Sequence, residues 1–211
     1  MKKQQDRIKL VKEISKAANL YRTNLVGKQF MYVFDNRYIE VLYKASSFRH
    51  LTGVDTYLSA KQYYRYAAKN VLSASQIYFN KNHPYDLAVR KVKHLSNLAT
   101  MASSENFMLE EITTDTKQYK FGTTDLKFTL CMNKELDDFG NEKGDCYIVE
   151  SLRDEDCFSR SKDAYVVTHI FSKPNDVKQY TDLLFMDSSA SMTDLSENIK
   201  CLLVPELLKN N

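Results

Sequence analysis

The apolar residues in the first half of the chain are spaced as in helices. Over residues 4–26 they recur at steps of three and four, which predicts an amphipathic helix. Ser59 is a suitable N-cap for a second helix over about 60–71. Pro84 suits the first turn of a third, over about 84–102. The front of the chain is therefore expected to be mainly helical.

A short stretch of strand pattern interrupts these helices. Residues 29–34 and 38–44 read as two strands, and residues 35–37 between them have turn chemistry, so a β-hairpin is expected. The hairpin leads into residues 47–54, Ser-Phe-Arg-His-Leu-Thr-Gly-Val. The serine and the glycine of this segment are placed to cap one helical turn, and the glycine marks a position with special backbone needs.

After residue 101 the pattern changes to that of strands. Consecutive strands without helices between them predict an antiparallel meander. We expect an α+β fold: N-terminal helices and a hairpin, followed by an antiparallel four- to five-stranded sheet and a C-terminal helix. That helix begins near Ser191 and ends at Pro205. The expected strands of the meander are 106–112, 118–122, 125–132, 146–152 and 164–172.

Charge is unevenly distributed although the formal net charge is only +3. Residues 1–28 carry eight Lys or Arg and two acids, residues 61–94 carry seven and one, and residues 101–163 carry eight and fifteen. We therefore expect one domain over 1–211, with a basic, mainly helical part (1–102) and an acidic, mainly sheet part (103–211). A basic part suits a polyanionic partner. A solvated helix surface, or attraction between the two parts, explains the same pattern.

Cysteine and histidine spacing gives no metal site. The four cysteines contain no C-x-x-C pair and are expected to be reduced and structural, and no His-x-x-x-His occurs. No metal or cofactor is expected. No apolar run reaches membrane-spanning length, and the N-terminus lacks the apolar core of a secretory signal. A cytoplasmic protein without a membrane partner is expected.

Basic side chains on the predicted helices are candidates for binding nucleic acid. Tyrosines at 63, 64 and 66 are interleaved with some of them and either stack on bases or pack inward while the lysine stems reach solvent. Inward packing is the favoured interpretation. The candidate nucleic-acid-binding residues are Lys61, Arg65, Lys69, Arg90 and Lys93.

Three short motifs carry a resemblance. Residues 48–53 match Phe-x-His-Leu-x-Gly, residues 147–156 match a Tyr-x-x-Ser-Leu-Leu-x-Glu-Asp-like segment, and residues 170–173 match a strand ending in Phe-x-Lys. Over about residues 5–185 the chain thus resembles a phage-associated nuclease-like family related to barnase, EndoU, the RNase colicins and RelE (the BECR fold). Two departures are Glu150, where a proline is expected, and Arg153, where an aliphatic residue is expected.

The resemblance implies relatedness to nucleases, and fold alone does not fix function. The chemistry that we consider is RNA cleavage without a metal, in which the substrate's own 2′-hydroxyl attacks the phosphorus. Such a site removes one proton, supplies another and holds the charged phosphorane. His50 is the candidate acid or base. Candidates for neutralising the phosphate are Arg49, Arg153 and Lys173, and candidates for donating hydrogen bonds to it are Ser151 and Thr168.

Each of these residues also has an ordinary structural explanation. An isolated histidine such as His50 is usually structural, Ser151 can simply end a strand, and Arg153 can pair with the acids that follow it. Lys173 can be a solvated strand end. His169 is a second candidate or a core side chain. Ser151 and Arg153 lie two apart, so strand alternation places them on one face.

The leading interpretation is a metal-independent, ribonuclease-like protein of phage or prophage origin, acting by general acid–base chemistry in the cytoplasm of a bacterial host. One alternative is a non-catalytic phage factor that binds nucleic acid or inhibits a host nucleic-acid-handling complex. Another is an interaction protein that uses its acidic part on a host protein.

Overall fold

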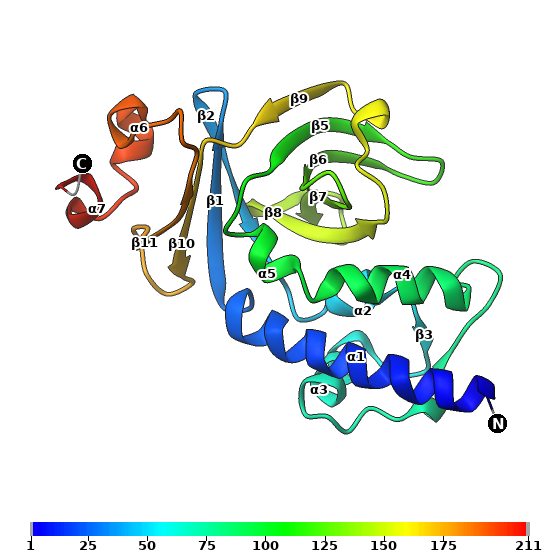
Figure 1. The fold of residues 1–211 in the computed structure, drawn as a ribbon. Helices are drawn as coiled ribbons and strands as arrows, with labels where there is room; N and C mark the ends of the chain where they lie inside the picture. The colour runs from blue at the N-terminus through cyan, green and yellow to red at the C-terminus, as the bar shows by residue number, and fades with distance from the viewer. Residues whose placement is uncertain (1, 210–211) are drawn as a thin grey trace.

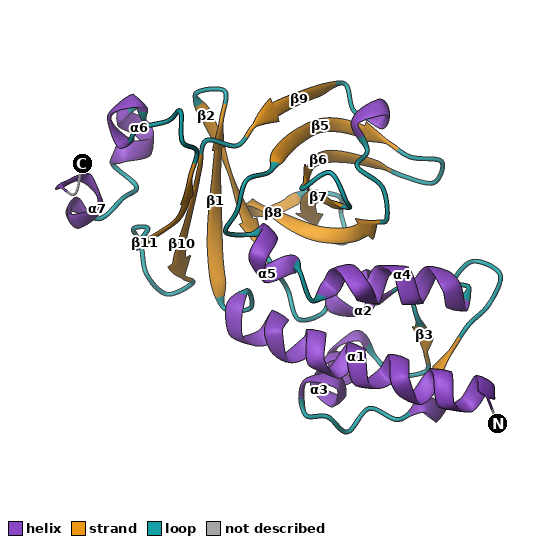
Figure 2. Cartoon of the chain, viewed as in Figure 1, coloured by secondary structure: helices purple, strands orange, loops and turns teal. Residues whose placement is uncertain are grey.

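Five helices form a layer over one face of a large sheet in the computed structural model, which describes residues 2–209 (Figures 1 and 2). The helix predicted over 84–102 is divided in two near Ser96. The short helical turn predicted within 47–53 is confirmed, and Gly53 ends it in the left-handed conformation. The helices are α1 (Lys2–Asn24), α2 (Phe48–Thr52), α3 (Ala60–Ala68), α4 (Tyr85–Leu95) and α5 (Leu98–Met101).

Nine strands form the sheet, in the order β11-β10-β1-β2-β8-β7-β6-β5-β9. All neighbours are antiparallel except β2 and β8, which are parallel. A separate two-stranded ribbon pairs β3 (Asp55–Thr56) with β4 (Ile77–Tyr78). The strands of the sheet are β1 (Lys28–Phe34), β2 (Arg37–Leu42), β5 (Phe107–Thr113), β6 (Gln118–Thr124), β7 (Thr129–Leu136), β8 (Glu142–Arg153), β9 (Asp163–Val166), β10 (His169–Pro174) and β11 (Asp182–Met186).

The prediction of an antiparallel sheet of four or five strands was wrong, because the sheet is mixed and has nine strands. The β1–β2 hairpin is part of the sheet rather than a separate element, and β8 adds to it in parallel. The strand β11 was missed. The alternation of apolar and polar residues indicates which face of a strand is buried, but it does not indicate which other strand pairs with that strand.

The segment predicted as one strand over 164–172 forms two. β9 pairs with β5 and β10 pairs with β1, although only Val167 and Thr168 separate them. The sheet therefore curls until its β9 edge returns to β1. Consistent with this, the Thr168 amide donates to the Val33 carbonyl at 2.8 Å, and the rings of Phe34 and Tyr165 lie 5.7 Å apart.

Two apolar layers cover the β1 region of the sheet. Phe30, Tyr32 and Phe34 alternate toward the main core beneath the helices, whereas Met31 and Val33 face the C-terminal segment. The C-terminal helix predicted between residues 191 and 205 was wrong as a single element. The segment forms a 3₁₀ turn (Met192–Asp194) and two short helices, α6 (Glu197–Lys200) and α7 (Pro205–Lys209).

Residues 2–209 contain no disulfide bond and no helix that could span a membrane. All four cysteines are free, and Cys131 and Cys157 are buried beside each other. None of the described helices combines the length and apolar character needed to cross a bilayer.

Candidate functional site

A cleft opens where β2 and β8, which pair in parallel within the sheet, separate. β2 and β8 share two residue pairs, Val41 with Tyr147 and Leu42 with Ile148. Beyond Leu42 the chain leaves the sheet toward α2, while β8 runs on to Arg153. Because the two strands run in the same direction, the residues that follow these two pairs in both segments lie near each other, and they form walls of the cleft.

This cleft has a volume of about 1030 Å³ and lies among α2, α4 and the end of β8. Both halves of the sequence contribute polar side chains to it. Those with acid–base or anion-binding capacity include His50, His83, Lys91, Glu150, Ser151 and Arg153.

A β-bulge shapes the β8 wall of the cleft. Ser151 pairs with Cys131 and Val149 pairs with Met132, so Glu150 is an extra residue in the ladder. A bulge of this kind redirects side chains, and Glu150 and Ser151 both line the cleft. Glu150 stands where the family resemblance leads one to expect a proline.

The Glu150 carboxylate is held by neighbours from the adjoining strands. It accepts a hydrogen bond from Lys117 Nζ at 2.7 Å and a longer one from Asn133 Nδ2 at 3.3 Å. The Ser151 hydroxyl is close to Tyr119. Burial raises the pKa of Tyr119, and the hydrogen bond to Ser151 opposes that shift. The bulged segment is thus tied to β6 and β7.

His50 is presented to the cleft by a well-anchored turn. Phe48 and Leu51 of α2 are fully buried, whereas His50 is exposed. Although the residue as a whole is exposed, partial desolvation of its ring lowers the pKa of His50, and the positive charge of Arg49 lowers it further. Glu150 opposes the shift. The neutral imidazole is therefore favoured near neutral pH, ready to accept a proton.

His83 lines the same cleft and is oriented by Asp55. Its Nδ1 lies 2.9 Å from Asp55 Oδ2, and the Asn80 side chain also hydrogen-bonds that carboxylate. A carboxylate partner fixes Nδ1 as the protonated nitrogen, which leaves Nε2 available for a second proton transfer. Two histidines thus share the cleft with different surroundings.

Lys91 and Arg153 supply positive charge to the cleft. Among the described residues Lys91 has no hydrogen-bond or ion-pair partner; burial lowers the pKa of its amine, and repulsion from Arg153 adds to this. Arg153 Nε also lacks a hydrogen bond within residues 2–209, and its nearest acid, Glu155, is 3.6 Å away. Two desolvated cations side by side favour an anion between them.

Gly53 makes room for Lys91. A Cβ atom built on this glycine would lie 2.8 Å from Lys91 Cδ, shorter than any ordinary carbon–carbon contact. The backbone of Gly53 also has φ +66°, which side chains other than glycine rarely adopt. One glycine thus ends α2 and lets the lysine stem pass beside it.

The predicted catalytic set is only partly gathered. His50, Ser151 and Arg153 line the cleft, and Arg49 adjoins His50 without lining it. Thr168 and Lys173 lie elsewhere, on and beside β10.

Both residues at β10 have structural partners. Thr168 Oγ1 donates to the Val33 carbonyl, and Lys173 Nζ donates to the Lys178 carbonyl over the ring of Tyr180. His169 is a core side chain, 1% exposed, with its ring stacked on Phe171. Curling of the sheet does not bring β10 to the cleft, because β1 and β2 lie between β10 and β8.

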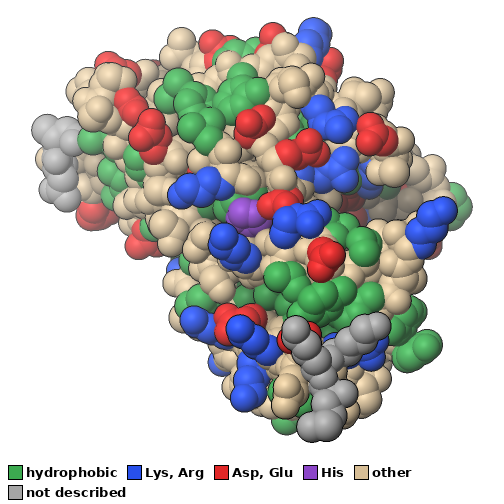
Figure 3. Space-filling model, turned by 45° about the vertical axis from the view of Figure 1, so that its right-hand side comes forward, with side chains coloured by type: hydrophobic (Ala, Val, Ile, Leu, Met, Phe, Trp, Pro, Cys, Tyr) green, Lys and Arg blue, Asp and Glu red, His purple; other side chains and the backbone are tan. Residues whose placement is uncertain are grey.

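The five predicted nucleic-acid-binding residues lie outside the cleft lining. Lys61 and Arg65 on α3 and Lys69 directly after it are exposed, whereas Tyr63 and Tyr64 of α3 pack inward. The remaining two lie on α4: Lys93 is exposed, and Arg90 donates to Asp154 at 2.6 Å. On the face drawn in Figure 3, acidic and basic side chains are interspersed rather than sorted into one basic surface.

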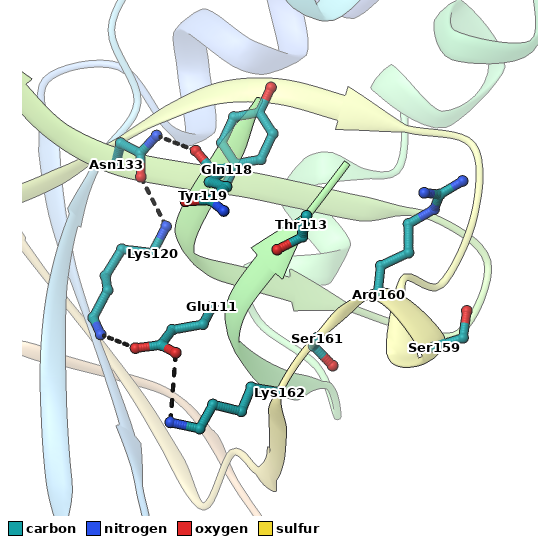
Figure 4. Close-up of a pocket in the computed structure, with 10 residues that line it drawn as sticks. All are labelled: Glu111, Thr113, Gln118, Tyr119, Lys120, Asn133, Ser159, Arg160, Ser161 and Lys162. Carbon is teal, nitrogen blue, oxygen red and sulfur yellow. Dashed lines mark hydrogen bonds and ion pairs between the residues drawn. The ribbon is translucent and has the colours of Figure 1, made fainter. Parts of the chain in front are cut away.

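A second hollow lies on the β5–β6 side of the sheet, next to the cleft at Tyr119 (Figure 4). Its lysines already have acidic partners: Lys120 and Lys162 both reach Glu111. Arg160 pairs with acids as well. Paired cations attract an added phosphate less than Lys91 of the cleft does, because Lys91 has no ion-pair partner among the described residues. Within residues 2–209 no three Cys, His, Asp or Glu side chains gather as metal ligands.

Sequence reasoning missed His83, Asp55 and Lys91. Asp55 belongs to a strand of two residues, too short for an alternation pattern, and the ribbon alone brings it to His83. Lys91 was counted only as one of the charges of a basic helix. The one sequence feature that pointed toward Lys91 was Gly53, because glycine is scarce in this chain and the Lys91 side chain lies against Gly53.

A sequence model of the family described as phage-Barnase-EndoU-ColicinE5/D-RelE like nuclease4 matches residues 13–188. No curated protein and no solved structure matches the chain.

Proposed function

The chain belongs to the phage-Barnase-EndoU-ColicinE5/D-RelE like nuclease4 family, and on that premise we propose that it is a metal-independent ribonuclease of phage or prophage origin. The observation that carries the proposal is the convergence of two histidines and two cations, Lys91 and Arg153, on one cleft, where Lys91 has no ion-pair partner among the described residues. It would act on RNA in the cytoplasm of a bacterial host.

In this proposal the scissile phosphate lies between Lys91 and Arg153. Their charges balance the extra negative charge that develops on the phosphorane oxygens, and the Ser151 hydroxyl donates a hydrogen bond to it. The lowered pKa of Lys91 reflects the energetic cost of burying its amine near Arg153. A bound phosphate removes much of that cost, because it pairs with both cations.

His50 takes the role of general base. It removes the proton of the ribose 2′-hydroxyl while that oxygen attacks the phosphorus, and the bond to the 5′-oxygen breaks. In this proposal His83 enters the step with both ring nitrogens protonated: its Nδ1–H stays on Asp55, and its Nε2 proton goes to the departing 5′-oxygen. The products are a 2′,3′-cyclic phosphate and a free 5′-hydroxyl, with the two histidines having exchanged protonation states.

The test is cleavage of single-stranded RNA in EDTA, with the same oligomer carrying 2′-deoxyribose throughout as a second substrate. We expect RNA to be cut to 2′,3′-cyclic phosphate ends and the DNA analogue to survive. His50→Ala and His83→Ala should each lower kcat by about a hundredfold or more. Arg65→Ala removes an exposed cation outside the cleft and should leave the rate unchanged.

Two results would contradict this assignment. Cleavage of the 2′-deoxy oligomer would exclude the 2′-hydroxyl as nucleophile. Absence of RNA cleavage at any enzyme concentration, together with salt-sensitive binding that Lys61→Ala and Arg65→Ala weaken, would favour a non-catalytic nucleic-acid-binding factor instead.

A further inference from the structure

An exposed tyrosine, Tyr57, directly follows β3 of the two-stranded ribbon and lies against the half-buried Tyr78 of β4. The rings of Tyr57 and Tyr78 lie 4.7 Å apart with their planes inclined by 33°. Tyr57 is 85% exposed. A ring that buries so little surface adds little to the apolar core, and most of its area is left open to a ligand.

The ribbon directs these tyrosines away from the core. Asp55 pairs with Tyr78 and Thr56 pairs with Ile77, and the second pair is buried. Because side chains alternate along a strand, Asp55 and Tyr78 point to the opposite, outer side. Tyr57 lies two residues after Asp55 and stacks on Tyr78, so it shares that side.

The same outer side carries the link to the cleft. Asp55 binds His83 Nδ1 at 2.9 Å, and His83 lines the cleft. Ala60, three residues after Tyr57, lines it too. Side chains directly opposite each other on paired strands have Cβ atoms about 5 Å apart, so Tyr78 is close to the carboxylate that holds His83.

We propose that Tyr57 and Tyr78 form a stacking platform for an unpaired base of single-stranded RNA, next to the nucleotide whose phosphate enters the cleft. This inference rests on the proposed ribonuclease function. Aromatic rings bind bases of any sequence by stacking, whereas the cleft supplies the charges that hold the backbone. A base in a duplex is already stacked and paired, so the platform selects single strands.

The absence of tryptophan from the chain allows a direct test. Tyr57→Trp keeps a stacking ring and introduces a single fluorophore. We expect a 2′-O-methyl single-stranded oligonucleotide, which the proposed chemistry cannot cleave, to quench its emission saturably. The same oligonucleotide in a duplex should quench much less. Val166→Trp, on the exposed edge strand β9, is the control and should not respond.

Affinity gives the second measurement. By fluorescence anisotropy, Tyr57→Ala should bind the single-stranded oligonucleotide roughly fivefold to a hundredfold more weakly, the range expected for loss of one stacked base. Tyr57→Phe keeps the ring and should bind as the unaltered protein does. Since Tyr57 is almost fully exposed, Tyr57→Ala should unfold at an unchanged temperature.

The outcomes separate the two proposals. If the oligonucleotide binds but leaves the emission of Tyr57→Trp unchanged, or if Tyr57→Ala binds and cleaves RNA normally, the platform is refuted and the ribonuclease proposal stands. Quenching and weakened binding without any RNA cleavage would support the platform and refute the ribonuclease. Failure of the oligonucleotide to bind at all would refute the platform.

Discussion

Gly53 ends α2 with a positive φ and leaves room for the Lys91 side chain, and the substitution Gly53→Ala tests both roles. At φ +66° an L-residue costs about 1–2 kcal/mol relative to glycine. For a chain of this length each kcal/mol lowers the unfolding temperature by about 2–4 °C, so the variant should melt roughly 2–8 °C lower. The new methyl group also meets Lys91 Cδ at 2.8 Å. The lysine stem is flexible and should move aside, which displaces its amine.

Stability and activity should therefore respond differently when Lys91 is removed. In a Lys91→Ala background, Gly53→Ala should still cost about 1–2 kcal/mol, because the backbone strain remains. Its effect on RNA cleavage should disappear, because no amine is left to displace. Urea unfolding and single-turnover cleavage of all four combinations measure both quantities as double-mutant cycles.

Gly27 provides the matched control for this experiment. It follows α1 with φ +84°, and a Cβ there meets no atom within 4 Å. Gly27→Ala should lose comparable stability and keep full activity. The reasoning fails if Gly53→Ala is as stable as the unaltered protein. It also fails if Gly53→Ala lowers the residual activity of Lys91→Ala as strongly as it lowers that of the unaltered protein.

Three further predictions concern charge around the cleft. The kcat/KM for RNA should fall as the pH drops through the pKa of His50, which is lowered from its ordinary value of about 6.5. Arg49→Gln should move that fall to higher pH, because it removes a charge that lowers this pKa; an unchanged rate–pH profile would show that Arg49 does not act on His50. Asp55→Asn should lower kcat more than it raises KM, because His83 loses the carboxylate that fixes its tautomer; steady-state kinetics decide this. Burial raises the pKa of Asp154, but the hydrogen bonds that Asp154 accepts from His94 and Arg90 of α4 outweigh burial, and the pKa is lowered. The ionised Asp154 therefore stabilises the fold above about pH 3.9, and this stabilisation is lost as the pH falls through the lowered pKa. Asp154→Asn should thus lose less stability between pH 5 and 3 in urea unfolding, and equal losses would refute the linkage.

Local structure followed from local sequence at the segment around His50. Two buried apolar residues and a glycine predicted a short helical turn ended by Gly53, and α2 has that form, but the Ser47 side chain makes no capping hydrogen bond at its start. Alternation likewise placed Ser151 and Arg153 on one face of a strand, and both line the cleft. In each case the deciding interactions lie within a few residues of chain.

Long-range pairing could not be read in the same way. Nothing in residues 38–44 or 146–152 indicates that these strands lie side by side in parallel, and that pairing creates the cleft. His83 and Asp55 are likewise joined only by the β3–β4 ribbon, whose strands have two residues each. The family resemblance gave the right family, but not the pair of histidines or the position of Lys91.

The short parallel seam between β2 and β8 also sets when this cleft can exist during synthesis. The ribosome makes α2 and His50 early, but the opposite wall requires the chain through Arg153 to have emerged. Until then a nascent chain carries the His50 turn without the β8 wall of the cleft across from it. A truncated product that stops before β8 should therefore lack the proposed cleavage of RNA.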